Sequence, residues 1–191
     1  MDTCDNLSNF SEQIAFPSYD AFPDIELYMD QVIDFLSRSR VSLRANDKLS
    51  PAMVNNYIKA ELMPRAHGKK YSREHLIHLA VIARLKQVLS VIDTGTLIRA
   101  GREDKTDEEF FESFRQRADE AAEEISSVTS DDGGNPADIA MEFAVRSYLY
   151  KVACEHILDG IGTTGQKKPV KSSHEKKPSK SDQKKSEKTA E

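Results

Sequence analysis

Residues 49–89 constrain the fold of this 191-residue chain more than any other segment, because helix signals alternate there with a basic turn. Ser50 and Pro51 provide an N-cap followed by proline at the first helical position, so a helix is predicted to start there. Pro64 ends that helix, a glycine turn follows, and Ser72 caps another helix. The pattern predicts a helix, a short basic hairpin and a second helix.

Charge is divided unevenly along the chain. Residues 49–89 hold seven basic and two acidic residues, a balance of +5 in a chain whose net charge is −5. Residues 101–145 hold fourteen acidic and four basic residues, a balance of −10. Phosphate binding requires a local basic surface, which the acidic remainder hides in the overall isoelectric point. The regional charge therefore favours a nucleic-acid partner for residues 49–89.

Other classes of protein lack their sequence signals here. No stretch approaches the roughly 18 apolar residues of a membrane span, and the first residues do not resemble a signal peptide, so we expect a cytoplasmic protein with no membrane partner. Cys4 and Cys154 lack metal-ligand spacing, and His75 and His78 have only Glu74 beside them. With no nucleophile elbow, phosphate-binding loop or dinucleotide fingerprint, we expect no enzyme, cofactor or metal.

The segments around this basic stretch differ in composition. Residues 1–22 are predicted to be an irregular arm that lies on the folded part through aromatic anchors: Phe10, Phe16, Tyr19 and Phe22. From Asp24, apolar residues at helical spacing predict the first helix of a domain at 23–100. Residues 161–191, with nine lysines among them, are predicted to be a disordered Lys/Ser-rich tail. Attraction to DNA, contact with the acidic segment, or solubility alone would each explain this tail.

Residues 101–160 are predicted to be an acidic helical region. Thr106 and Glu109 form a capping box, and the helix they start has one apolar face: Phe110, Phe111, Phe114, Ala118, Ala121, Ala122 and Ile125. The run 137–158 is apolar on most of its circumference, which predicts a helix buried against several partners. A homodimer seam or an effector pocket is the alternative for this second helix.

The helix at about 50–62 offers a candidate DNA-reading surface. Its buried face is predicted from helical spacing: Val54, Tyr57, Ile58 and Leu62. The residues left pointing mostly outward are Ala52, Met53, Asn55, Asn56 and Lys59. An asparagine amide can pair with an adenine edge in the major groove or donate to a phosphate. The alternative is that these are ordinary solvated polar residues.

The basic turn at 65–71 offers a second candidate surface. Its proposed contact residues, with one more at the start of the next helix, are Arg65, Lys69, Lys70, Tyr71 and Arg73. Cations in such a turn can contact phosphate, which sets affinity and register without reading sequence. A solvated loop is the alternative interpretation.

Val54 to Leu89 resembles the winged-helix module of MerR-type regulators. Three landmarks carry the resemblance: Asn55-Asn56-Tyr57 at the family's Arg-Tyr-Tyr-like triplet, Leu62-Met63-Pro64 at the helix end, and Tyr71-Ser72-Arg73-Glu74-His75-Leu76 at the restart. The resemblance implies an all-α fold containing a winged helix-turn-helix with a short wing. It places Asn55 and Asn56 at groove-facing or phosphate-facing positions, and Arg65, Lys69, Lys70 and Tyr71 in the wing.

The sequence also departs from the MerR pattern. Glu61 stands where those proteins usually have glycine, a residue that accepts a positive φ at low cost. No cysteine stands where the metal-sensing members place theirs, and no sustained heptads follow Leu89. The MerR regulatory mechanism is therefore not carried over to this chain.

The combination of ELYMDQVIDFL, the NNYIKA helix, GKKYSREHL and LKQVLS is similar to a bacterial family of small proteins defined only as a domain of unknown function.

From the basic segment and the MerR resemblance, we expect a transcription regulator that binds double-stranded DNA with the helix at 50–62 in the major groove and the wing at 65–71 on phosphate. A homodimer on paired half-sites is a further expectation. The alternative is a non-catalytic protein-interaction module with the same fold, which would depend on an exposed apolar patch.

Overall fold

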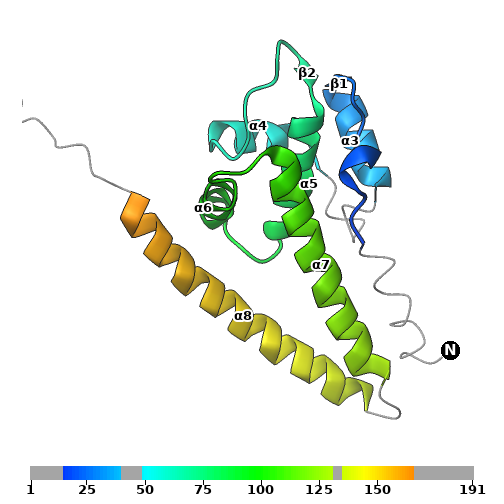
Figure 1. The fold of residues 1–191 in the computed structure, drawn as a ribbon, viewed down its shortest axis with the longest axis vertical. Coiled ribbons are helices and arrows are strands. Elements are labelled where there is room, and N and C mark those ends of the chain that lie inside the picture. The colour runs from blue at the N-terminus through cyan, green and yellow to red at the C-terminus, as the bar shows by residue number, and fades with distance from the viewer. Residues whose placement is uncertain (1–14, 40–48, 131–134, 166–191) are drawn as a thin grey trace, which may run out of the picture.

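The computed structural model describes residues 15–39, 49–130 and 135–165, and this part of the chain is almost entirely helical (Figure 1). In chain order the elements are η1 (Tyr19–Ala21), β1 (Leu27–Tyr28), α3 (Met29–Arg38), α4 (Pro51–Lys59), β2 (Lys70–Tyr71), α5 (Arg73–Leu85), α6 (Val91–Gly101), α7 (Asp107–Ser130) and α8 (Pro136–Gly165). The all-α architecture predicted from the sequence is confirmed. Among the described helices, none combines the length and the apolar character that crossing a membrane would require.

Helix α5 lies at the centre of the core. Nine consecutive residues, 75–83, are buried, so this helix is enclosed on every side rather than along one stripe. It packs against α3, β2 and α7 (Figure 1). The sequence predicted a helix starting after Ser72, and the structure buries even Ile77, His78 and Val81 on it. A helix that is buried all round fixes the elements packed on each of its faces relative to one another.

The described residues before β1, 15–26, lie on the helical core and are irregular apart from η1; the predicted arm was 1–22, and residues 1–14 lie outside the described part of the chain. Phe22 is fully buried and its ring meets Phe111 of α7 edge to face, with ring centroids 5.2 Å apart. Phe16 packs on Phe114 in the same way at 5.0 Å. The backbone N–H of Tyr19 donates to Oε1 of Glu112 at 3.2 Å. The predicted anchor Phe10 and the tail beyond residue 165 lie outside the described residues.

Two predicted helix starts are confirmed by their caps. The N–H of Met53 donates to Oγ of Ser50 at 3.3 Å, and Pro51 occupies the first position of α4. At α7, the N–H of Thr106 donates to Oε2 of Glu109 at 2.8 Å, while the N–H of Glu109 donates to Oγ1 of Thr106 at 3.2 Å. Both caps satisfy N–H groups that lack partners within the helix.

The start of the first helix was predicted wrongly. Apolar spacing placed it at Asp24, whereas α3 begins at Met29 and Ile25 is exposed. The intervening residues are extended because Leu27 and Tyr28 pair antiparallel with Tyr71 and Lys70. The basic turn is therefore not a self-contained hairpin. Its returning strand β2 pairs with β1, whose residues lie 42 and 44 positions earlier in the chain, and within the turn His67 bridges to Lys70.

Helix α8 differs from its prediction more strongly. The run 137–158 was expected to be buried against several partners, and that expectation is wrong for the single chain. Helix α8 contacts α6, and of its described side chains only Leu158 is buried (Figure 1). Helix α8 diverges from α7 along its length, so among the described elements none covers one side of α8.

Helix α4 ends in a tight turn that orients the chain toward the basic loop. Ala60 is the C-cap, and the N–H of Glu61 donates to the carbonyl of Ile58 at 3.1 Å. The N–H of Leu62 donates to the carbonyl of Tyr57 at 3.0 Å, which completes a Schellman motif. This motif requires a left-handed residue, and Glu61 has φ of 57°. Glu61 therefore adopts the backbone conformation that a glycine usually supplies in this turn.

The strain at Glu61 leads to a stability prediction. We expect Glu61→Gly to raise the free energy of unfolding by about 0.5 to 1 kcal/mol, because glycine adopts positive φ without the Cβ clash that other residues meet. Ala60→Gly is the matched control: its φ is −84°, so glycine there adds only entropy to the unfolded chain and lowers stability. Urea unfolding followed by circular dichroism measures both. Equal destabilisation by the two variants would show that the turn at Glu61 is unstrained.

Candidate nucleic-acid interface

The outer face of α4 is exposed, as helical spacing predicted. Ala52, Asn55, Asn56 and Lys59 are all exposed, while Val54 and Tyr57 on the other face are buried. Met53 departs from this pattern because it is half-buried and packs against the core. The accessible polar groups of α4 are therefore two amides and one ammonium on a helix whose apolar face is fixed in the core.

The basic loop that follows carries three exposed cations, Arg65, Lys69 and Lys70. Gly68 has φ of 63° and allows the tight turn between them. Tyr71, also proposed as a contact, is only 5% exposed, and its ring meets the ring of His75 edge to face at 5.6 Å. Burial raises the pKa of its phenol. Tyr71 therefore anchors the loop and does not offer its ring to the surface.

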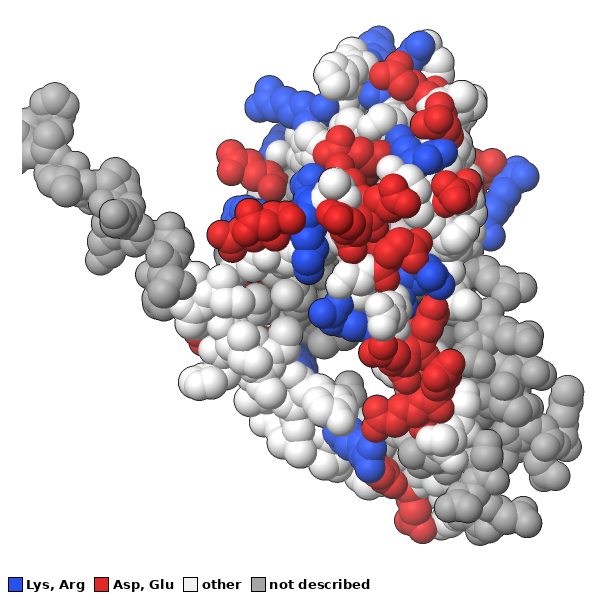
Figure 2. All heavy atoms as spheres, in the orientation of Figure 1, with Lys and Arg blue, Asp and Glu red and all other residues white. Residues whose placement is uncertain are grey.

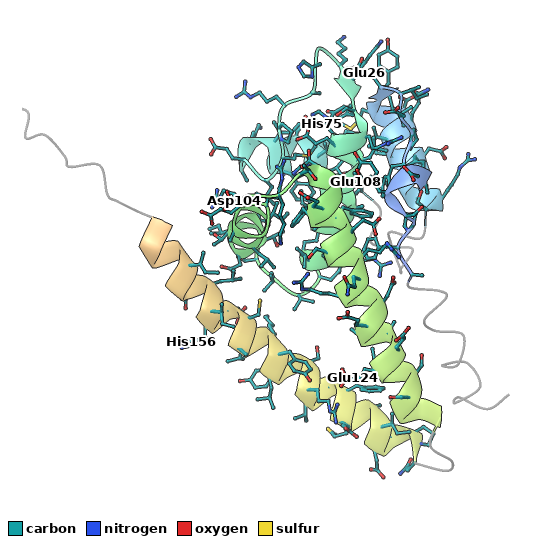
Figure 3. The ribbon with its side chains drawn as sticks, viewed as in Figure 1. Glu26, His75, Asp104, Glu108, Glu124 and His156 are labelled. Atoms are coloured by element: carbon teal, nitrogen blue, oxygen red, sulfur yellow. The ribbon has the colours of Figure 1, made fainter. Side chains whose placement is uncertain are left out.

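His75 joins the two ends of this loop, a role that was not predicted. Its Nδ1 accepts the backbone N–H of Ser72 at 3.2 Å, so its Nε2 carries the proton and donates to the carbonyl of Arg65 at 3.3 Å. Figure 3 shows His75 inside the fold at the start of α5. The signal in the sequence was its position three residues after the cap, where a side-chain acceptor completes a capping box.

Not all cations of the 49–89 segment face outward. Arg73, another proposed contact, lies over the ring of Tyr19 at 5.1 Å and pairs with Asp24 across 3.7 Å. Arg84 lies over the ring of Phe16 at 4.8 Å. Lys70 stays exposed but has a Glu26 carboxylate 3.9 Å from its Nζ. The accessible positive charge is therefore concentrated on α4 and its loop, with Lys59, Arg65 and Lys69 contributing most.

The acidic helix α7 leaves this face open. Figure 2 shows acidic side chains running along α7, away from the basic loop. Helix α7 packs on α5 and on η1, and four of the five proposed contacts of α4, all but Met53, are exposed with α7 in place. Covering of the basic face by the acidic helix does not occur within the described residues.

A half-buried charge cluster lies where α5, α6 and α7 meet. The ligand atoms of Glu74, His78 and Asp107 lie within 4.8 Å of one another, a spacing that could hold a metal ion. The guanidinium of Arg102 already contacts all three: Nη1 donates to Nε2 of His78 at 2.8 Å, and Nη2 pairs with Glu74 at 3.5 Å and with Asp107. The positive charge that a cation would supply is thus supplied by the chain.

The cluster shifts the pKa values of two of its members. Burial lowers the pKa of His78, whose Nδ1 donates to the carbonyl of Glu74 at 2.9 Å while its Nε2 accepts from Arg102. This pairing fits the neutral imidazole. Burial raises the pKa of the Glu74 carboxyl, and the carboxylate of Asp107 raises it further. The sequence suggested a pair of His75 and His78 as the weak metal pattern, but each imidazole has separate structural partners.

An open groove of about 630 Å³ connects this cluster to the candidate interface. It runs from the end of α4 to the end of α6, and its lining residues are Ile58, Lys59, Glu61, Leu62, Met63, Pro64, Arg65, Glu74, Ile98, Arg99, Arg102 and Glu103. Four cations and three carboxylates surround an apolar floor there. Lys59 and Arg65 therefore belong both to the groove and to the basic face.

The lowered pKa of His78 predicts a pH dependence of stability. Below pH 6.5 the unfolded chain binds a proton at His78 that the folded chain excludes, so stability is fully present above that pH and falls as the pH drops through about 6.5. The raised pKa of Glu74 acts in the opposite sense, at pH values just above 4.5. Urea unfolding of His78→Gln is expected to show a weaker pH slope, by up to about 1.4 kcal/mol per pH unit. His156→Gln, at an exposed histidine of α8, is the control and keeps the parental slope.

The family described as a domain of unknown function, DUF1836, matches residues 17–120. The match covers the arm from η1 onward, the charge cluster, both candidate contact surfaces and the first half of α7. No curated protein and no solved structure matches the chain. Since the matched segment is more than half of the sequence, the chain belongs to the DUF1836 family.

Proposed function

We propose that this protein binds double-stranded DNA as a transcription regulator, with α4 in the major groove and the loop at 65–70 on the flanking phosphates. The observation that carries the proposal is the exposure of Asn55, Asn56 and Lys59 beside the three loop cations, on the less acidic part of a net-acidic chain. Amides read base edges and cations bind phosphate, so this pairing of residue types fits DNA better than it fits a neutral partner.

The scaffold around this face favours a DNA reader as well. Helix α4 is capped at both ends, and Val54 and Tyr57 fix its rotation by packing in the core. The His75 hydrogen bonds hold the two ends of the loop at a set separation. Groups that are already in position lose little conformational entropy on binding, which raises affinity without additional contacts.

Within the proposal, α4, the loop with β2, and α5 take the parts of a winged helix-turn-helix of MerR-like type. The small sheet of β1 and β2 would be the base of the wing, and the positive φ of Glu61 would preserve the turn that a glycine usually makes in that family. The wing is short, so its contribution is to phosphate contacts and register, and sequence reading falls to α4.

The first test concerns base reading. Selection from a random duplex pool with the full chain is expected to enrich a defined motif, and Asn55→Ala/Asn56→Ala is expected to lose it. Each bidentate amide-to-adenine pair contributes about 1 to 3 kcal/mol of discrimination. Gln116→Ala, an exposed amide on the acidic helix α7, is the matched control and keeps the enrichment. An unchanged motif in the double variant would remove α4 from the reading role.

The second test concerns the phosphate contacts. Lys69→Ala/Lys70→Ala is expected to weaken binding to all sequences alike and to reduce the slope of log affinity against log salt by about 2. Lys105→Ala removes an exposed lysine from the connection between α6 and α7 and is expected to leave the slope unchanged. If neither pool selection nor titration detects binding at low salt, the same face serves a protein partner instead, and the DNA proposal fails.

A further inference from the structure

One side of α8 carries a continuous apolar stripe that is exposed in the single chain. Met141, Val145, Tyr148, Leu149 and Val152 are spaced by four, three, one and three residues, which places them on one face of the helix. Their side chains are 65%, 49%, 65%, 56% and 43% exposed. Away from the stripe, α8 meets α6, with Leu158 buried, and Arg146 pairs with Glu124 of α7 at 3.5 Å, while Tyr150 on the opposite side is 66% exposed.

A surface of this kind is unusual for a monomer. Single exposed apolar residues are common, but contiguous apolar patches mark surfaces that are covered in the functional state. Figure 2 shows the face of α8 turned toward the viewer as mostly uncharged beside the acidic surface of α7. A long helix that is apolar on most of its circumference is stable in water when other surfaces cover its faces.

The charges that border the stripe narrow the choice of partner. On one edge Arg146 pairs with Glu142 at 2.6 Å, and on the other Lys151 pairs with Glu155 at 3.8 Å. Between residues 142 and 155, each edge of the stripe therefore carries one cation and one carboxylate and no net charge. A strongly acidic or basic partner gains no attraction here, whereas a second neutral, apolar-centred face meets no repulsion.

We propose that a second copy of this chain covers the stripe, with two α8 helices packed face to face. The same five apolar residues then meet their own copies, which is what a two-fold symmetric interface requires. The stripe lies beyond residue 120, outside the DUF1836 match, and is separate from the proposed DNA face. The dimer would also bring two α4 helices into one particle.

The size of the stripe sets the expected strength of the dimer. The stripe runs from Met141 to Val152, which is 12 residues of helix, so it is about 18 Å long and about 10 Å wide and has a footprint on the order of 180 Å². Two such faces stay below the roughly 1,200 Å² of stable specific interfaces, so the contact is that of a weak dimer. The dimer should dissociate on dilution.

Sedimentation velocity of the full chain, without DNA, tests this proposal over about three decades of concentration. The parent is expected to move from the mass of one chain to that of two as concentration rises. Val145→Lys/Leu149→Lys is expected to keep the mass of one chain throughout, with unchanged helix content, because both side chains are exposed and lysine is a good helix former. A second variant, Tyr148→Ser/Val152→Ser, is expected to do the same without added charge.

Tyr150→Lys is the matched control. This side chain is 66% exposed on the same helix, but it lies two residues from Tyr148 and so points to the opposite side, and its variant should dimerise like the parent. A parent that stays at the mass of one chain at the highest concentration overturns the proposal. So does dimerisation of both stripe variants at the parental concentration. Because no DNA is present, either result leaves the DNA proposal to its own test.

Discussion

The burial of α5 is the constraint on which the other elements depend, because α3, β2 and α7 all pack against this helix. Residues 75–83 are enclosed without a break, with α3, β2 and α7 packed around them. A helix with no free face cannot rotate to accommodate a change on one side. The first turn of α5 also positions the candidate interface, since His75 holds the carbonyl of Arg65 and the N–H of Ser72 together.

The second organising feature is the way in which charge is divided. Arg102 gathers Glu74, His78 and Asp107 into one half-buried cluster, so the first carboxylate of α7, Asp107, is paired at the helix junction. Arg73 and Arg84 lie on aromatic rings of the arm. What stays accessible is a small basic face on α4 and its loop and an acidic surface along α7. Electrostatic attraction to DNA, under the proposed function, would therefore also orient the molecule.

The two proposals divide the chain between them. The candidate DNA face lies within residues 17–120, which the DUF1836 family matches, while the apolar stripe lies on α8 beyond it. A regulator built in this way would combine a reading unit with a separate pairing unit. The open groove between the ends of α4 and α6 shares Lys59 and Arg65 with the basic face and extends to the Arg102 cluster.

Local signals in the sequence determined the elements with local causes. Ser50 with Pro51, and Thr106 with Glu109, start their helices as predicted, since a cap needs only residues three positions apart. The exposed polar face of α4 follows from the helical period alone. The aromatic anchors Phe16 and Phe22 were also predictable, because large apolar side chains in an irregular segment gain free energy only by packing on the core.

Only the tertiary structure decided features that depend on contacts between distant segments. Spacing alone read Asp24 as a helix start, but pairing of Leu27 with Tyr71 keeps those residues extended. The net charge of residues 49–89 counts all seven cations alike. The fold shows that Arg73 and Arg84 instead lie over aromatic rings of the arm. For α8 the apolar pattern correctly predicted a helix and predicted that it would be buried. Which of its faces another helix covers depends on the positions of the other helices, which the pattern does not contain. An apolar side chain can be recognised in the sequence as one that favours burial, whereas the packing of whole helices determines which surface buries it.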